Sequence, residues 1–179
     1  LMLTFLLICT ITKAQVPDQS VDFKNSKVVF KDNKIMVSTG KIERTWNLTE
    51  NGLQTVSIKN QLSREEYAKI DSKYNCDWDL PGAINDTTIA ELLGIEVSEN
   101  DDEGFVSKHL QIISTIRYPA ARIEIQHVIW VFPNAPGVRT QLRVKALEGF
   151  SSENLPDKEG KRMDCGHWIA VPSSRTEYL

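Results

Sequence analysis

The sequence predicts an all-β protein, an antiparallel β-sandwich with one or two short helices. Two observations lead to this fold class: short stretches in which apolar and polar side chains alternate, and clusters of turn residues between those stretches. Alternation places one face of a strand against a core and the other toward solvent, and many short strands of this kind are typical of a sandwich. The composition, 41% apolar and 25% charged residues, is that of an ordinary globular domain.

Two hairpins are predicted in the first third of the chain. Residues 28–30 and 35–37 are apolar and flank a turn at Asp32-Asn33. Residues 42–48 and 53–58 flank Glu50-Asn51-Gly52, and Asn-Gly is the strongest short hairpin signal. We therefore expect each pair of segments to form neighbouring antiparallel strands.

A third hairpin is predicted from residues 123–131 and 138–146, which alternate almost without exception. The connection between them is rich in Pro and Gly, as a chain reversal requires. The first of these strands becomes apolar on both faces at Val128 and Trp130, which indicates a central position in its sheet. Further strands are expected at residues 110–116 and 169–171.

Helical signals are weak. Residues 63–70 begin with Ser63 followed three positions later by Glu66, the pattern of a capping box, and residues 87–93 are a second short candidate. Residues 62–86 otherwise break the strand pattern, and we expect this polar insertion to lie on the surface, where it could bind a ligand.

The two ends of the chain differ from its middle. Residues 1–14 have the apolar run and small residues of a signal peptide cut at its start, too short to span a bilayer, which takes roughly 20 residues. A buried strand or helix is the alternative; a lipid anchor at Cys9 is disfavoured because bulky Ile8 precedes it. The sandwich domain is assigned to residues 15–150. Residues 151–179 are assigned to a linker and the truncated start of a following segment.

Export also bears on the cysteines and on the partners. A secreted or periplasmic location would allow Cys76 and Cys165 to form a disulfide, and two separate thiols are the alternative. The net charge of −3 and the absence of a contiguous basic cluster argue against nucleic acid as a partner. Neither a membrane span, nor a metal site, nor a cofactor is expected.

The candidate binding residues are Asp77, Trp78 and Asp79, because sugar sites combine an aromatic ring with carboxylates and amides. Core packing is the alternative for Trp78, and it is the expectation for Trp46 and Trp130, which lie within strand patterns. No catalytic residue is assigned. Asp77 and Asp79 could form a carboxylate pair only in an extended strand, and Glu124 and His127 are expected on opposite faces of theirs.

Three short segments, in this order and spacing, resemble the N-terminal β-supersandwich domain of α-galactosidase-like (melibiase-type) glycoside hydrolases. They are Ile42-Glu43-Arg44, Gly52-Leu53-Gln54-Thr55 and the run from Ala135 to Gln141. The resemblance covers about residues 25–150 and implies a galactose-mutarotase-like supersandwich. In that family the domain precedes a (β/α)8 barrel that carries the catalytic aspartates, and no segment of this chain resembles the barrel.

The resemblance therefore implies a non-catalytic domain of a secreted glycoside hydrolase, which supports the catalytic barrel and its substrate cleft. Carbohydrate and the barrel would be its partners. The alternative is a stand-alone carbohydrate-binding module in which the Trp78 segment grips the glycan. A mutarotase-like enzyme is a weaker third option, because a shared fold does not establish a shared activity.

Overall fold

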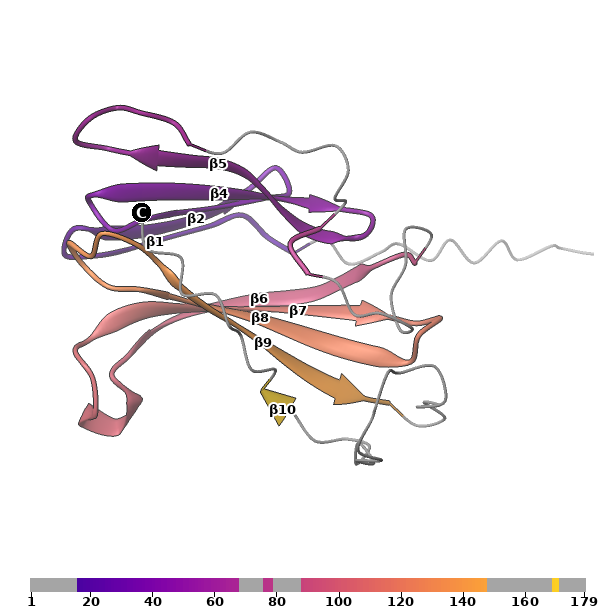
Figure 1. Cartoon of the computed structure of the whole chain (residues 1–179). Coiled ribbons are helices and arrows are strands. Elements are labelled where there is room, and N and C mark those ends of the chain that lie inside the picture. Colours follow the sequence, from indigo (N-terminus) through magenta and orange to yellow (C-terminus); the bar gives the residue numbers. More distant parts are fainter. Residues whose placement is uncertain (1–15, 68–75, 79–87, 148–168, 171–179) are drawn as a thin grey trace, which may run out of the picture.

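The computed structural model describes residues 16–67, 76–78, 88–147 and 169–170. Two five-stranded antiparallel sheets lie face to face, as Figure 1 shows, and this confirms the predicted all-β sandwich. The first sheet has the strand order β1-β2-β3-β4-β5 and the second the order β10-β9-β8-β7-β6. The signal-peptide segment, Asp79, Cys165 and most of residues 151–179 lie outside the described residues.

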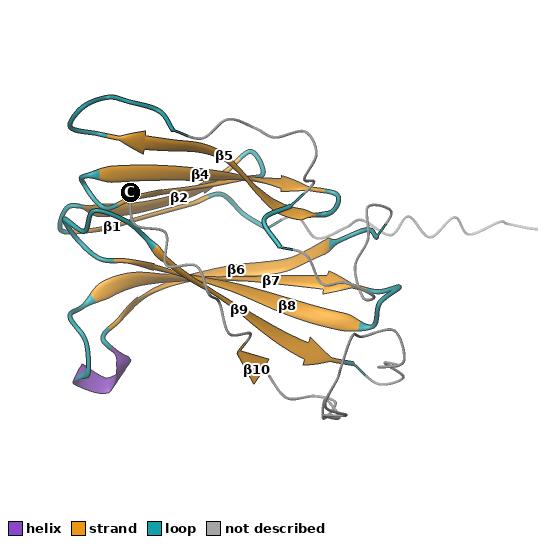
Figure 2. Ribbon diagram, viewed as in Figure 1, coloured by secondary structure: helices purple, strands orange, loops and turns teal. Residues whose placement is uncertain are grey.

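The strands follow one another along the chain, and each pairs with its neighbours in sequence. In the first sheet they are β1 (Gln19–Phe23), β2 (Ser26–Lys31), β3 (Lys34–Ser38), β4 (Ile42–Thr49) and β5 (Gly52–Asn60). In the second they are β6 (Glu91–Asn100), β7 (His109–Tyr118), β8 (Ile123–Val131), β9 (Arg139–Ala146) and the two-residue β10 (Ile169–Ala170). Figure 2 shows that strands make up most of the regular structure in the described part of the chain.

All three predicted hairpins are present. Asp32 and Asn33 connect β2 to β3 with φ values of 51° and 59°, the left-handed conformation that a two-residue hairpin turn requires. Strands β4 and β5 are joined at Glu50 and Asn51, and β8 pairs with β9 from Ile123 opposite Ala146 onward. Strand β8 is central in its sheet, as its apolar second half predicted.

The two helices expected at residues 63–70 and 87–93 are absent from the described parts of those segments, so these two predictions are wrong there. Beyond Ser63 the chain folds back on β5: the Tyr67 amide donates to the Ile58 carbonyl at 2.8 Å, and the Ser57 hydroxyl donates to the Glu66 carboxylate at 2.6 Å. The glutamate that suggested a capping box is thus used by the neighbouring strand. Residues 91–93 begin β6, and the described residues contain one 3-10 turn, Asp102–Gly104.

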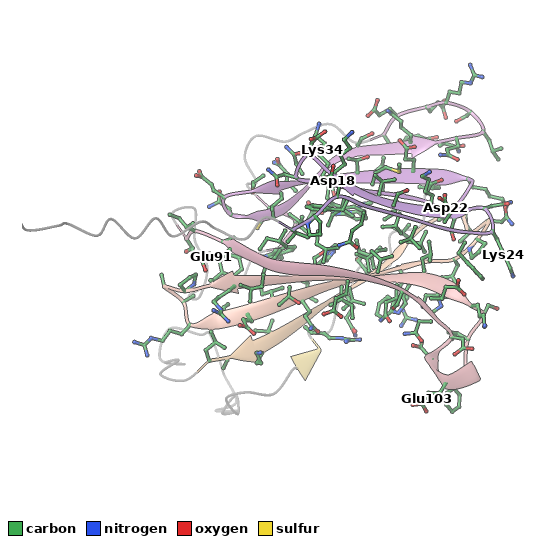
Figure 3. All side chains as sticks on the ribbon, turned by 180° about the vertical axis from the view of Figure 1, so that it is seen from behind. Asp18, Asp22, Lys24, Lys34, Glu91 and Glu103 are labelled. Atoms are coloured by element: carbon green, nitrogen blue, oxygen red, sulfur yellow. The ribbon has the colours of Figure 1, made fainter. Side chains whose placement is uncertain are left out.

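The core lies between the two sheets. It is built from the inward-facing side chains of both, which alternate with outward-facing ones along each strand. Figure 3 shows side chains filling the space between the layers, whereas labelled charged residues such as Lys34 and Glu103 point away from it. The largest fully buried side chains are Trp46, Tyr118, Ile35, Leu53, Leu110, Ile112 and Ile116.

The connection between β8 and β9 also ties the sheets together. The Asn134 amide donates to the Thr39 carbonyl at 2.7 Å, and the Thr39 hydroxyl donates to the Ala135 carbonyl at 2.7 Å. The Asn25 side chain donates to the Asn134 side chain at 2.9 Å. Because Thr39 and Asn25 belong to turns of the first sheet, this loop of the second sheet is held at a fixed distance from it.

Candidate functional site

The candidate residues Asp77 and Trp78 lie at the edge of the sandwich, next to the start of β5. The Asp77 amide donates to the Leu53 carbonyl at 2.8 Å, which aligns this short segment with the strand. From there the two adjacent side chains reach different sheets. We call Asp77, Trp78 and the side chains that bind them the clasp.

Asp77 connects the segment to the first sheet. One carboxylate oxygen accepts from the Thr55 amide at 2.7 Å, and the other accepts from the Trp46 indole Nε1 at 2.9 Å and from the Thr55 hydroxyl. The Arg44 guanidinium is 3.4 Å from the same oxygen, and the side chain of Asp77 is 22% exposed. The carboxylate is therefore surrounded by donors of β4 and β5, and it binds this segment to the edge of the first sheet.

Trp78 connects the segment to the second sheet. Its side chain is buried, with 7% relative exposure, and its ring centroid lies 5.6 Å from that of His127 on β8. The indole Nε1 donates to the Tyr118 hydroxyl at 2.9 Å, and that hydroxyl donates to the Asn51 carbonyl at 2.7 Å. Of the two possibilities for Trp78, an exposed sugar platform or core packing, the structure shows core packing.

His127 lies on the inner face of β8, between two tryptophans. The Trp46 ring is 5.7 Å away on one side and the Trp78 ring 5.6 Å away on another. Burial lowers the pKa of His127 to about 4, although the nearby Asp77 charge acts in the opposite direction. The imidazole is consequently neutral at neutral pH. Its Nδ1 has no hydrogen-bond partner among the described residues, and neither does the hydroxyl of its cross-strand neighbour Ser114.

Burial also raises the pKa of the Tyr118 hydroxyl well above its ordinary value. The hydroxyl therefore keeps its proton at any working pH, and it can accept from Trp78 while it donates to Asn51. The clasp is thus a set of neutral and charged hydrogen bonds that joins the two layers, and its chemistry is that of a structural connection.

Glu124 faces the opposite side of β8 from His127, as the spacing in the sequence predicts. It forms ion pairs with Arg117 on β7, at 2.6 Å, and with Lys145 on β9. Burial by itself would raise the pKa of the Glu124 carboxyl, but the hydrogen bonds and charges of Lys145 and Arg117 outweigh it and hold the pKa below its ordinary value. A His127–Glu124 acid/base couple is excluded by this geometry.

The outward side of the second sheet carries the arrangement that the sequence interpretation missed. A cluster of amide, guanidinium and indole groups covers neighbouring positions of β8 and β9, and we call it the outer patch. It consists of Gln126, Trp130, Arg139, Gln141 and Arg143 together with Val128, and the strand register places them opposite one another in pairs. Val128 and Trp130 are buried within it.

Trp130 was expected in the core, and its burial agrees with that expectation. The residue is buried, with 7% relative exposure, but it lies outside the hydrophobic cluster between the sheets. The Arg139 guanidinium covers its ring, 5.0 Å from the centroid, and the indole Nε1 has no hydrogen-bond partner among the described residues. The alternation of β8 already indicates that Trp130 faces outward, because it is an even-numbered residue of the strand, as Glu124 and Gln126 are.

The described residues contain neither a metal-binding cluster nor a membrane-spanning helix. Within them, no three His, Cys, Asp or Glu side chains come together as a metal ion requires. No helix of the described part is long and apolar enough to cross a membrane. The Cys76 thiol lies 2.9 Å from the Trp78 carbonyl oxygen, and since Cys165 lies outside the described residues, their disulfide stays a prediction.

Comparisons with protein-family models, with curated proteins and with solved structures found no match to this chain. The resemblance to the α-galactosidase-like domain is therefore carried by the three sequence segments alone, and the functional argument depends on the clasp and the outer patch.

Proposed function

We propose that this chain is a non-catalytic β-sandwich domain of an exported α-galactosidase-like glycoside hydrolase, and that it contacts carbohydrate through the outer patch. The observation that carries the proposal is the composition of this surface. Two glutamine amides, two guanidinium groups and an indole share one side of two neighbouring strands. The three family-like segments support the assignment to a hydrolase.

The groups of the outer patch match the chemistry of a sugar. Hydroxyl groups both donate and accept hydrogen bonds, and the Gln126 and Gln141 amides offer both roles, whereas arginine offers fixed pairs of donors. The sheet holds these groups at a spacing of about 4.8 Å between strands and roughly 7 Å along a strand, so that several can contact one extended ligand. The buried Trp130 ring lies beneath Arg139 and holds that guanidinium in place.

The bonding of the carboxylates of Asp77 and Glu124 supports a non-catalytic role. A glycosidase needs two carboxyl groups at either side of one bond, about 5 to 9.5 Å apart. Asp77 is held by donors of the first sheet, and Glu124 is held by two cations on the outward side of the second. Each is already committed to a structural partner, and they belong to different surfaces.

The proposal also assigns a role to the clasp. Asp77 and Trp78 fix the point at which the polar insertion meets the sandwich, and Asp79 follows directly in sequence. In a complete hydrolase this insertion would reach the substrate cleft of the (β/α)8 domain, with Asp77 and Trp78 as its anchor. The rival proposal, a stand-alone carbohydrate-binding module, uses the same outer patch and needs no second domain.

The flanking gene sequence separates these two. An alternating strand-and-helix pattern that encodes a (β/α)8 barrel next to this domain would support the hydrolase, and its absence from both sides would support the stand-alone module.

Calorimetric titration with a panel of galactose-containing and other plant polysaccharides tests carbohydrate binding itself. We expect the chain to bind in the micromolar to millimolar range, and both Arg139→Ala and Gln141→Ala to weaken binding about tenfold or more, the loss of one good contact. The matched control, Lys34→Ala, changes an exposed residue of the first sheet and should bind as the parent does. Unchanged affinity in both outer-patch variants would remove this surface from consideration, and circular dichroism would show that they remain folded.

A further inference from the structure

We propose that the carbohydrate recognised by the outer patch is acidic: a polysaccharide bearing uronate or sulfate groups, which pair with Arg139 and Arg143. This inference rests on the proposed function and specifies its substrate class. It is carried by the distribution of charge over the outward side of the second sheet.

The outward residues of β9 form a basic row. Arg139, Arg143 and Lys145 all point to this side, because they alternate with the core-facing residues of the strand. Together with Arg117 of β7 they place four cations on the outward side of the three strands β7, β8 and β9, against the single carboxylate of Glu124. This surplus is local, since the whole chain has a net charge of −3.

Two of these cations lack a carboxylate partner. Lys145 and Arg117 are both paired with Glu124, whereas neither Arg139 nor Arg143 is within ion-pair distance of any acidic group in the described parts of the chain. Among the described residues, the nearest acidic side chains on this side of the sheet, beyond Glu124, are Glu91 and Glu96 of β6. That strand lies three positions from β9, roughly 14 Å across the sheet.

Both arginines are nevertheless held in place. The Arg139 guanidinium rests on the Trp130 ring at 5.0 Å, and the Arg143 Nε donates to the Gln141 side chain at 3.3 Å. These contacts orient the guanidinium groups without neutralising them, which reduces the conformational entropy lost when an anion binds. The planar guanidinium fork matches the geometry of a carboxylate or sulfate group better than a lysine would.

The spacing of the two arginines selects an extended ligand. They are four residues apart on one strand, about 13 Å along its length. A single small anion can satisfy one of them but not both. A polysaccharide with repeated anionic groups can contact both while its hydroxyl groups reach Gln126 and Gln141 between them.

The test compares three polymers by calorimetric titration of the whole chain: polygalacturonate, dextran sulfate and neutral galactomannan. Measurements at about 0.05 M and about 0.3 M sodium chloride reveal the ionic contribution, because salt screens exposed charges. We expect polygalacturonate or dextran sulfate to bind at least tenfold more tightly than galactomannan at low salt, and this preference to shrink at high salt.

The decisive variant is the double substitution Arg139→Gln and Arg143→Gln, which keeps hydrogen-bonding groups but removes both charges. It should lose the preference for acidic polymers by about tenfold or more. Lys31→Gln with Lys34→Gln is the matched control: the same change in net charge on the first sheet, where both residues are exposed, should leave the preference intact.

The other outcomes are distinguishable. Equal binding of neutral and acidic polymers, unaffected by the arginine substitutions, would overturn this inference and leave the proposed function standing. Failure of every polysaccharide to bind would overturn the proposed function as well. A single-stranded oligonucleotide that bound as tightly as polygalacturonate would show that the patch recognises polyanions in general, and the inference would be wrong.

Discussion

At the scale of single residues, Asp77 shows how far in the sequence the partners of one side chain can lie. Its charge and its place beside a tryptophan suggested contact with sugar. In the structure the carboxylate accepts hydrogen bonds from Thr55 and Trp46 and lies beside Arg44. The residue types around Asp77 correctly indicated a polar cluster. The partners of the carboxylate, however, belong to strands more than twenty residues away in the sequence, and a local motif does not reveal them.

Removing this carboxylate should destabilise the fold. Asp77→Ala leaves the Trp46 indole and the Thr55 amide without their acceptor, so we expect a loss of about 2–4 kcal/mol in the free energy of unfolding. Urea denaturation measures it as a lower midpoint. Asp22→Ala is the control, because it removes an exposed ion pair with Lys27 and should cost less than about 1 kcal/mol. Equal midpoints for the two variants would contradict the role of the clasp.

At the scale of elements, the β4–β5 hairpin depends on more than its turn signal. Gly52 has a φ of +136°, which side chains rarely adopt. A Cβ atom there would also lie 2.7 Å from the Trp78 ring and 2.8 Å from the Tyr118 hydroxyl. Because Gly52 has no side chain, it leaves room for the Trp78 ring and the Tyr118 hydroxyl of the clasp.

Gly52→Ala should therefore be far more damaging than an ordinary substitution in a strand. We expect it to lower the free energy of unfolding by about 2–4 kcal/mol, from backbone strain and from displacement of Trp78. Near-ultraviolet circular dichroism should change as well, since the indole moves. Gly94→Ala in β6 is the matched control: nothing lies within 4 Å of a Cβ placed there, so its midpoint should move little in either direction. Similar effects of both alanines would rule out the steric explanation.

At the scale of the whole molecule, the sandwich is held together by contacts that cross from one sheet to the other. Trp46 of the first sheet and Trp78 of the clasp both lie against His127 of the second. The titratable and charged groups around His127 are Asp77, which favours the protonated imidazole, and Arg44, which opposes it; burial outweighs both. The joint between the layers should consequently respond to pH.

Because the pKa of His127 falls from its ordinary 6.5 to about 4 on folding, the unfolded chain binds the proton more readily. Stability is then fully present above pH 6.5 and is lost as the pH falls toward 4. We expect the free energy of unfolding to drop by about 2 kcal/mol between pH 7.5 and pH 5 on account of this residue.

His127→Gln should remove that part of the pH dependence, whatever it does to stability at pH 7.5. The measurement is a set of urea titrations of both proteins across this range, compared by slope against pH. An unchanged slope in the variant would show that His127 is not the group responsible.

The fold class, the three hairpins and the central place of β8 could be predicted from the order of the residues, because alternation and turn residues are local properties that need no distant partner. The same order also placed His127 and Glu124 on opposite faces. The surroundings of each strand face could not be predicted in this way, because they depend on how the strands pack together. The burial of Trp78, the loss of the helix at residues 63–67 to pairing with β5, and the gathering of arginines and amides on the outer patch all arise from strands brought together from separate parts of the chain.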